Sequence, residues 1–154
     1  MTALDGLNPD FRDLLVALLD EDAEFLIVGA FAVAFHGAPR ATGDLDVVVR
    51  PSPENARRVW RALVRFGAPI QSVGLTEQDL ARAGTVYQIG LPPRRIDVLT
   101  ELSGLSFDEA WESREAAQLG GRRLYFLGRA ALIRNKLATG RPKDVADVAS
   151  LKGE

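Results

Sequence analysis

Residues 25–50 read FLIVGAFAVAFHGAPRATGDLDVVVR, and this stretch decides how the chain folds. It opens with the apolar run Phe25 to Val28, which predicts a short buried strand. Gly29 follows, and the small residues from Ala30 to His36 predict a helix that begins where the strand ends. After a turn, a second apolar run predicts a strand over Asp46 to Arg50. The stretch is therefore a strand–helix–strand unit.

Asp44 and Asp46 stand one residue apart at the head of that second strand. Side chains at positions i and i+2 of a strand point to the same face, roughly 6.6 Å apart along the chain. Like charges placed in this way repel each other unless water or a cation screens them. An acidic pair at this position is a poor way to stabilise a fold, so it indicates a chemical role.

The rest of the chain alternates between apolar-faced helices and short apolar strands. Further helices are expected at residues 9–19, 54–66, 76–83, 106–114, 128–139 and 142–151, and further strands at 85–89, 95–99 and 122–126. Gly90-Leu91-Pro92-Pro93 predicts a hairpin connection between two of these strands. No repeat or long linker divides the chain. The pattern predicts one α/β (α+β) domain over residues 1–154, with a small mixed β-sheet, helices packed around it and a helical C-terminal end.

Composition excludes several classes of function. Among the 154 residues, 47% are hydrophobic and 26% charged, which is ordinary for a globular protein, and the formal net charge of −2 provides no basic field for nucleic acid. The absence of cysteine and the single histidine exclude disulfide scaffolds, thiolate zinc sites and multi-histidine metal sites. The N-terminal sequence lacks the pattern of a signal peptide, and no apolar run is long enough to span a bilayer. A cytoplasmic protein without a membrane partner is expected.

A third acid, Asp97, lies inside the apolar segment from Arg95 to Leu99. A lone aspartate of this kind is commonly a strand-end cap, or half of an ion pair with a neighbouring arginine. On a strand adjacent to Asp44 and Asp46, it would instead complete a hard-oxygen pocket for one or two Mg²⁺ ions. Two such ions can activate an attacking oxygen and stabilise the leaving oxygen in phosphoryl transfer.

The order of these features resembles the polymerase-beta-like nucleotidyltransferase superfamily. The matching residues are Val28-Gly29-Ala30, His36-Gly37, the run Arg40-Ala41-Thr42-Gly43-Asp44-Leu45-Asp46, and Asp97 on a later strand. More narrowly, the sequence from Phe25 through Asp147 is similar to small bacterial nucleotidyltransferases related to the toxins of abortive-infection toxin–antitoxin systems. The resemblance implies a nucleotidyltransferase-like fold and an enzyme that transfers a nucleoside monophosphate from a nucleoside triphosphate to a hydroxyl acceptor.

The resemblance also implies roles for individual residues. Asp44, Asp46 and Asp97 would be catalytic and hold Mg²⁺ or Mn²⁺, and Asp97 would accept the proton of the attacking hydroxyl. Gly29 and Ala30 would bind the triphosphate at the helix start. Ala30 stands where the family usually has glycine or serine, but a backbone N–H can still point at a phosphate from alanine.

The tail, residues 133–147, IRNKLATGRPKDVAD, resembles the closing segment of the family. This match implies a catalytic role for Lys136 and a nucleotide-binding role for Lys143, since either ammonium can counter developing charge on phosphates. The alternative is a solvated turn formed by both lysines and Arg141, with Asp144 and Asp147 complementing the dipole of the last helix. For the lysines the family match favours function, whereas for Asp144 the alternative is at least as strong.

Three residues near the acidic pair keep two interpretations each. Arg40 could contact a nucleotide phosphate, since a guanidinium suits bidentate anion recognition, or it could pair with Asp44. Thr42 is likewise either a nucleotide-binding residue or a cap of the turn. His36 is expected to be a capping or core-edge residue that helps to orient the acidic loop.

Two rival functions come from other classes. Phosphatases of the haloacid-dehalogenase kind also carry an Asp-x-Asp pair, but there the apolar strand precedes the first acid, whereas here Val47 to Val49 follow the pair. A non-catalytic relative that binds a nucleotide or a partner is the other alternative. For the enzyme, an RNA 3′ end, a protein hydroxyl or a small molecule would serve as acceptor, and a cognate antitoxin is a further candidate partner.

Overall fold

The computed structural model describes residue 4 and residues 6–38 and 43–153. The helices are α1 (Pro9–Asp20), α2 (Gly29–Phe35), α3 (Pro53–Phe66), α4 (Glu77–Leu80), α5 (Phe107–Glu112), α6 (Arg129–Thr139) and α7 (Pro142–Leu151). The strands are β1 (Phe25–Val28), β2 (Leu45–Val49), β3 (Val86–Ile89), β4 (Ile96–Leu99), β5 (Glu115–Leu119) and β6 (Arg122–Phe126). Within these residues, no helix is both long enough and apolar enough to cross a bilayer.

The strands of the described residues form one mixed sheet of six, in the order β3-β4-β2-β1-β6-β5. β1 pairs with β2, β3 with β4 and β5 with β6 in antiparallel fashion, while β1 and β6, and β2 and β4, are parallel. This arrangement confirms the predicted small mixed sheet. The β3–β4 pair confirms the hairpin that was expected around Gly90 to Pro93.

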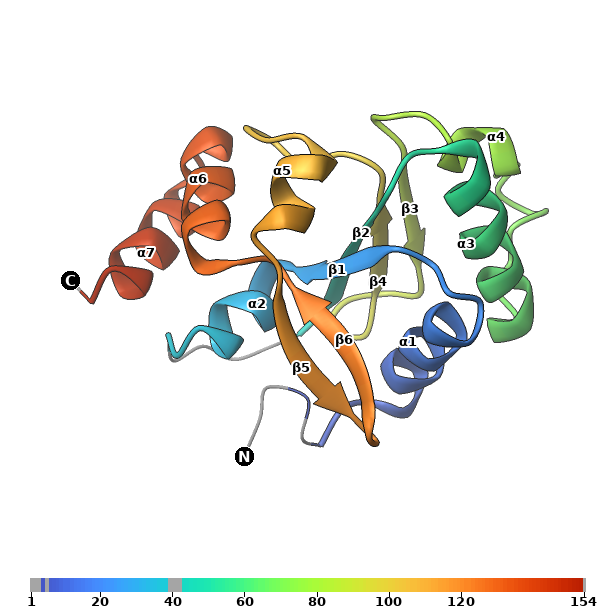
Figure 1. Ribbon diagram of the computed structural model, residues 1–154, viewed down its shortest axis with the longest axis horizontal. Helices are drawn as coiled ribbons and strands as arrows, with labels where there is room; N and C mark the ends of the chain where they lie inside the picture. The colour runs from blue at the N-terminus through green and yellow to red at the C-terminus, as the bar shows by residue number, and fades with distance from the viewer. Residues whose placement is uncertain (1–3, 5, 39–42, 154) are drawn as a thin grey trace.

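Helices cover both faces of the sheet. Adjacent residues of a strand point to opposite faces, and β6 shows where each face leads. Phe126 stacks on Phe35 of α2 with ring centroids 4.2 Å apart, whereas its neighbour Tyr125 meets Trp111 of α5 at 5.7 Å. Helices α2 and α5 therefore lie on opposite faces. Helices α6 and α7 stand together at one end of the molecule, away from α1 and α3 (Figure 1).

The helix ends follow the capping signals of the sequence. Ser52 caps α3 with Pro53 in its first turn, and Gly67 ends that helix in a left-handed conformation, as predicted. Thr76 and Asp79 form a full capping box at the start of α4. The helix itself covers only Glu77–Leu80, which is shorter than the 76–83 expected.

Strand β5 was not predicted from the sequence. Its residues, EAAQL, favour helices rather than strands, and most of their side chains are exposed. The strand forms because it pairs along its whole length with β6, from Glu115 opposite Phe126 to Leu119 opposite Arg122. The signal for it was Gly120-Gly121, a two-residue hairpin turn in which both residues have positive φ, 55° and 79°.

Candidate active site

The acidic residues meet at one place on the sheet. Asp46 is the second residue of β2 and lies opposite Asp97 of the parallel strand β4, so both side chains project from the same face. This register confirms the expectation that Asp97 lies on the same side of the sheet as Asp46. Asp44 immediately precedes β2, and its Oδ1 accepts a hydrogen bond of 3.0 Å from the backbone N–H of Arg95. The pair stands at the start of its strand, which is the reverse of the phosphatase arrangement.

Gly29 makes room for Asp46. It joins β1 directly to α2 with φ at +65°, in the left-handed region that favours glycine. A Cβ atom at this position would lie 2.1 Å from Oδ2 of Asp46, which is a severe steric clash for two non-bonded atoms. The glycine at the head of α2 therefore allows the carboxylate to pack against the helix start, in addition to any role in binding a phosphate.

The carboxyl of Asp46 has a raised pKa. The pKa of this carboxyl is raised from 3.8 to about 7, and burial is the largest cause. The charge of Asp97, a hydrogen bond with the Asp97 carboxyl and the charge of Asp44 act in the same direction, and the charge of Arg95 opposes them. A carboxyl that titrates near neutrality in a cavity is a common feature of functional sites.

Arg95 lies between two of the acids. Its Nε is 2.8 Å from Oδ1 of Asp97, and its Nη2 is 3.3 Å from Oδ2 of Asp44. The sequence suggested a neighbouring arginine as a partner of Asp97, but the contact of Arg95 with Asp44 was not expected. The signal was available, because Arg95 and Asp97 stand at positions i and i+2, the same spacing that places Asp44 and Asp46 on one face. The ion-pair alternative for Asp97 is confirmed, and it coexists with the acidic cluster.

The α6–α7 turn is held by a buried ion-pair network. Lys136 is 5% exposed and Asp144 fully buried. The ammonium of Lys136 lies 3.1 Å from Asp144 Oδ1 and 3.0 Å from Asp147 Oδ2, so it is bonded within the turn rather than to the acidic cluster. Thr139 and Arg141 also donate to Asp144. The solvated-turn alternative is therefore wrong for Lys136, whereas Asp144 does stand in the first turn of α7, as that alternative expected.

These bonds shift the titration of the buried acid. Burial alone would raise the pKa of Asp144, but the hydrogen bonds from Thr139, Arg141 and Lys136 outweigh it and lower the pKa to about 2. Asp144 is thus ionised at neutral pH and anchors both helices. Lys143 and Arg141, in contrast, have exposed side chains.

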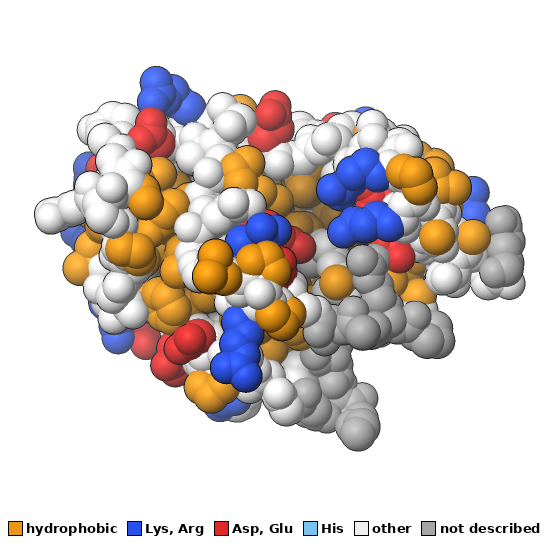
Figure 2. All heavy atoms as spheres, turned by 180° about the vertical axis from the view of Figure 1, so that it is seen from behind, with side chains coloured by type: hydrophobic (Ala, Val, Ile, Leu, Met, Phe, Trp, Pro, Cys, Tyr) orange, Lys and Arg blue, Asp and Glu red, His pale blue; other side chains and the backbone are white. Residues whose placement is uncertain are grey.

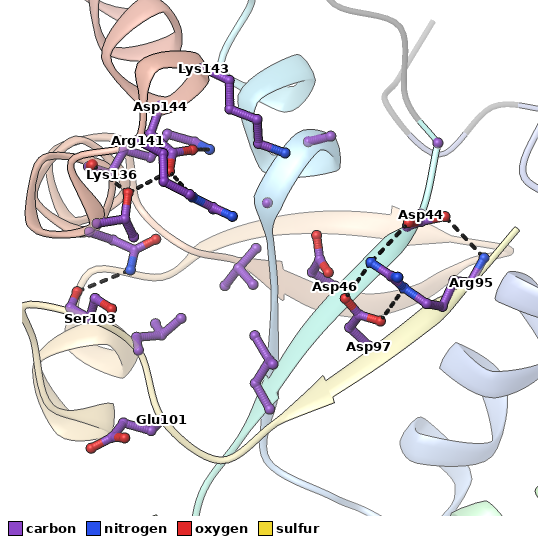
Figure 3. A pocket seen from close by; sticks show the side chains of 18 residues that line it. Asp44, Asp46, Arg95, Asp97, Glu101, Ser103, Lys136, Arg141, Lys143 and Asp144 are labelled. Atoms are coloured by element: carbon purple, nitrogen blue, oxygen red, sulfur yellow. Dashed lines mark hydrogen bonds and ion pairs between the residues drawn. The ribbon is translucent and has the colours of Figure 1, made fainter. Parts of the chain in front are cut away.

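A cavity of about 450 Å³ joins the acidic cluster to this turn. Residues from β1, α2, β2, β4, the loop after β4, α6 and α7 line it: Val28, Gly29, Ala30, Gly43, Asp44, Asp46, Arg95, Asp97, Leu99, Glu101, Leu102, Ser103, Asn135, Lys136, Thr139, Arg141, Lys143 and Asp144. Basic side chains stand on both sides of a hollowed part of the surface (Figure 2). Arg141 and Lys143 extend from the α7 end toward the acids on the sheet (Figure 3). The cavity therefore has an acidic floor and a basic end.

His36 does not line the cavity. Arg40 and Thr42 are outside the described residues. Nε2 of His36 lies 2.8 Å from the backbone oxygen of Leu127 and 3.5 Å from Glu115. His36 therefore stands at the C-terminal end of α2, as expected, and ties that end to the segment after β6.

The acidic cluster fits a divalent cation in its chemistry. Its donors are carboxylate oxygens, which Mg²⁺ and Mn²⁺ prefer, and Oδ1 of Asp97 is buried without a hydrogen-bond donor. As the side chains stand, however, no three His, Cys, Asp or Glu residues in the described part of the chain are grouped so that they could hold a metal ion. The guanidinium of Arg95 lies where the carboxylates of Asp44 and Asp97 come together.

The fold is that of the nucleotidyltransferases. A candidate nucleotidyltransferase from Thermotoga maritima superposes with a TM-score of 0.58 over 95% of this chain and 94% of its own, at 12% sequence identity. An antigenic nucleotidyltransferase-like protein from Paracoccidioides brasiliensis gives a TM-score of 0.49 over 94% of this chain and 77% of its own, at 13% identity. No protein-family model and no curated protein matches the chain. At such low identity the likeness concerns the fold alone.

Proposed function

We propose that the protein is a Mg²⁺- or Mn²⁺-dependent nucleotidyltransferase whose whole chain acts as one nucleotidyltransferase-like domain. It transfers a nucleoside monophosphate from a nucleoside triphosphate to a hydroxyl acceptor. The observation that carries the proposal is the charge pattern of one cavity, with Asp46 opposite Asp97 on its floor and Arg141 with Lys143 at its end. A triphosphate that carries a divalent ion presents both charges that this cavity can bind.

Each part of the cavity has a role in this reaction. Asp44, Asp46 and Asp97 would hold the divalent ion, which when bound screens the triphosphate and stabilises the leaving pyrophosphate. The backbone N–H groups of Gly29 and Ala30 would bind phosphate oxygens at the start of α2. Arg40 and Thr42, from the segment before Asp44, are proposed as further nucleotide contacts.

Lys143 and Arg141 would contact phosphates from the opposite end, since their side chains are exposed and reach toward the floor (Figure 3). Lys136 would have a positioning role. Its ammonium is bonded to Asp144 and Asp147 and holds the turn that carries the side chains of Arg141 and Lys143. It was expected to be catalytic, and the proposal now gives it this positioning role.

The chemical step is a displacement at the α-phosphate. Asp97 would accept the proton of the acceptor hydroxyl, whose oxygen forms a bond to the α-phosphorus while the bond to pyrophosphate breaks. Holding the two reactants in line in the cavity supplies much of the acceleration.

Transfer of labelled α-phosphate tests the proposal. The protein is incubated with each α-labelled triphosphate, Mg²⁺ or Mn²⁺ and a cell extract, and the labelled product is identified as RNA, protein or small molecule. Asp44→Asn and Asp46→Asn should each abolish labelling, while Glu112→Gln, an exposed carboxylate outside the cavity, should leave it unchanged. Full labelling by both aspartate variants would contradict the assigned site.

A non-catalytic nucleotide-binding or partner-binding protein is the second candidate. The observation that favours it is the pairing of Arg95 with Asp44 and Asp97, which occupies carboxylates that the enzyme needs for its cation. Equilibrium dialysis with labelled triphosphate separates the two, because a binding protein retains the nucleotide with no transfer in any extract.

The sequence resemblance to small bacterial nucleotidyltransferases that are related to abortive-infection toxins suggests a test in cells. Induced expression should slow growth of a bacterial host if the acceptor is a host RNA or protein, and Asp46→Asn should relieve the effect. A cognate antitoxin would be the partner that restores growth on co-expression with the unmodified chain.

A further inference from the structure

The guanidinium of Arg95 provides a positive charge within the acidic cluster. Its guanidinium reaches both Asp97, at 2.8 Å from Nε to Oδ1, and Asp44, at 3.3 Å from Nη2 to Oδ2. The arginine side chain is 29% exposed, and the side chains of Asp44 and Asp97 are 20% and 12% exposed. The positive charge therefore stands partly desolvated between two carboxylates that water screens only weakly.

The contact with Asp97 rests mostly on charge rather than on a directed bond. Although Nε and Oδ1 are 2.8 Å apart, the N–H does not aim at the oxygen, and both atoms are buried without a hydrogen-bond partner. The one side-chain hydrogen bond between the two residues, from Nη2 to Oδ2 of Asp97, is long at 3.4 Å. A buried acceptor with no donor costs free energy, so the site gains when another cation takes that oxygen.

The main chain keeps Arg95 in place independently of this contact. Its backbone N–H donates to Oδ1 of Asp44 at 3.0 Å, and its carbonyl accepts from the N–H of Leu45 at 3.0 Å. The guanidinium can therefore leave Asp97 without any change in the pairing of β2 with β4.

We propose that Arg95 is a resident cation of the acidic cluster and competes with a divalent ion for the oxygens of Asp44 and Asp97. A divalent ion binds there only as the guanidinium withdraws, so Arg95 sets the ion affinity of the site. The inference rests on the proposed function in one respect, the assignment of these aspartates as the cation site. It adds Arg95, which has no role in the proposed reaction, as the residue that sets the ion affinity of the site.

Binding of Mn²⁺ alone, measured by titration calorimetry and by the electron paramagnetic resonance of free Mn²⁺, tests the competition. Arg95→Gln removes the charge and keeps a polar side chain of similar reach. Arg94→Gln is the matched control, because it removes the same charge from the exposed preceding residue. Removing a unit charge beside the ion should tighten Mn²⁺ binding at least tenfold in Arg95→Gln. Arg94→Gln should stay within about threefold of the unchanged protein.

Two results separate the failure of this inference from the failure of the proposed function. If the unchanged protein binds Mn²⁺ and Arg95→Gln binds it equally or more weakly, Arg95 does not compete and the inference is wrong. If neither protein binds Mn²⁺, or Asp46→Asn binds it as well as the unchanged protein, the assigned cation site itself is wrong.

A measurement on the unchanged protein covers the case in which Arg95→Gln fails to fold. The Nε–H resonance of Arg95 is followed during a titration with Mg²⁺. It should move with the same midpoint as ion binding, because the guanidinium leaves Asp97. A resonance that stays in place while Mg²⁺ binds would overturn the proposal.

Discussion

Asp46 and Asp97 are register partners across the parallel strands β2 and β4, so two carboxyl groups meet on one face of the sheet. Burial and this neighbour raise the pKa of Asp46 to about 7. The pair stores unfavourable free energy when both groups are ionised, which a proton or another cation relieves. Stability and function therefore oppose each other at this position.

The first prediction follows from the raised pKa of Asp46. Between its unfolded value of 3.8 and its folded value of about 7, the folded protein binds a proton that the unfolded chain does not. The free energy of unfolding contributed by this group therefore falls as pH rises through that window, and it is constant above it. Asp46→Asn removes the effect and should be more stable than the unchanged protein at pH 8.

Urea denaturation at pH 5 and pH 8 measures this difference. The advantage of Asp46→Asn should grow by about 2.7 kcal/mol between the two pH values, since about two pH units lie between pH 5 and the folded pKa and each unit corresponds to about 1.4 kcal/mol. Glu112→Gln, at an exposed carboxylate outside the cavity, should show no such growth. An advantage that is the same at both pH values would show that Asp46 is ionised throughout.

The second prediction concerns the close approach of Gly29 to Asp46. Gly29→Ala should destabilise the protein for two reasons, because φ is +65° and because the new Cβ would meet Oδ2 of Asp46 at 2.1 Å. Gly67→Ala is the control, since Gly67 also has positive φ, 85°, but nothing lies within 4 Å of its added Cβ. The control should cost about 1 kcal/mol, the backbone part alone.

A double-mutant cycle isolates the contact between the two residues. In an Asp46→Ala background, Gly29→Ala should cost at least about 1 kcal/mol less than in the unchanged protein, because the clashing carboxylate is gone. Equal costs in both backgrounds would mean that Asp46 moves aside freely. Chemical denaturation of the four proteins gives the coupling free energy directly.

Most of the fold could be predicted from residues 25–50 and from the caps. The apolar run at Phe25–Val28, the glycine after it and the apolar run after the acidic pair each carry a local signal, and the structure confirms all three elements. Strand β5 could not be predicted from propensity, because its residues take a strand conformation only through pairing with β6. In that case the long-range partner, not the segment itself, determines the structure.

The site was less predictable than the fold. The prediction that Asp97 lies on a strand adjacent to Asp46 and on the same face is confirmed by the register of β2 with β4. The burial of Lys136 and Asp144 could not be inferred, because sequence gives no sign of how two helices close on their connecting turn. A lysine followed by an aspartate eight residues later describes a solvated turn as well as a buried pair.

The third prediction concerns acid denaturation. The folded pKa of Asp144, about 2, lies below its unfolded value of 3.8, so the stability from its bonds is complete above pH 4 and is lost as pH falls toward 2. The loss should amount to about 2 kcal/mol. Thr139→Val removes one donor to this carboxylate, so the folded pKa of Asp144 should lie closer to its unfolded value, and the variant should lose less stability between pH 5 and pH 2.5 than the unchanged protein. Guanidinium denaturation at pH 5, 3.5 and 2.5 follows the change, and identical pH profiles would contradict the assigned bonds.

The last prediction separates the two lysines of the α6–α7 turn. Lys136→Met leaves Asp144 buried with a smaller set of partners, and removing one member of a buried ion pair typically costs about 3–5 kcal/mol. Lys143→Met is the matched substitution at an exposed side chain, and it should change stability by less than about 0.5 kcal/mol.

For triphosphate affinity, the direct effect is expected at Lys143, because this residue is proposed to contact the phosphates. Lys143→Met should therefore weaken nucleotide binding about tenfold with an unchanged unfolding midpoint, measured by calorimetry and urea denaturation on the same samples. If Lys136→Met were as stable as Lys143→Met, the buried network would not hold the turn, and Lys136 would be available to act on the nucleotide itself.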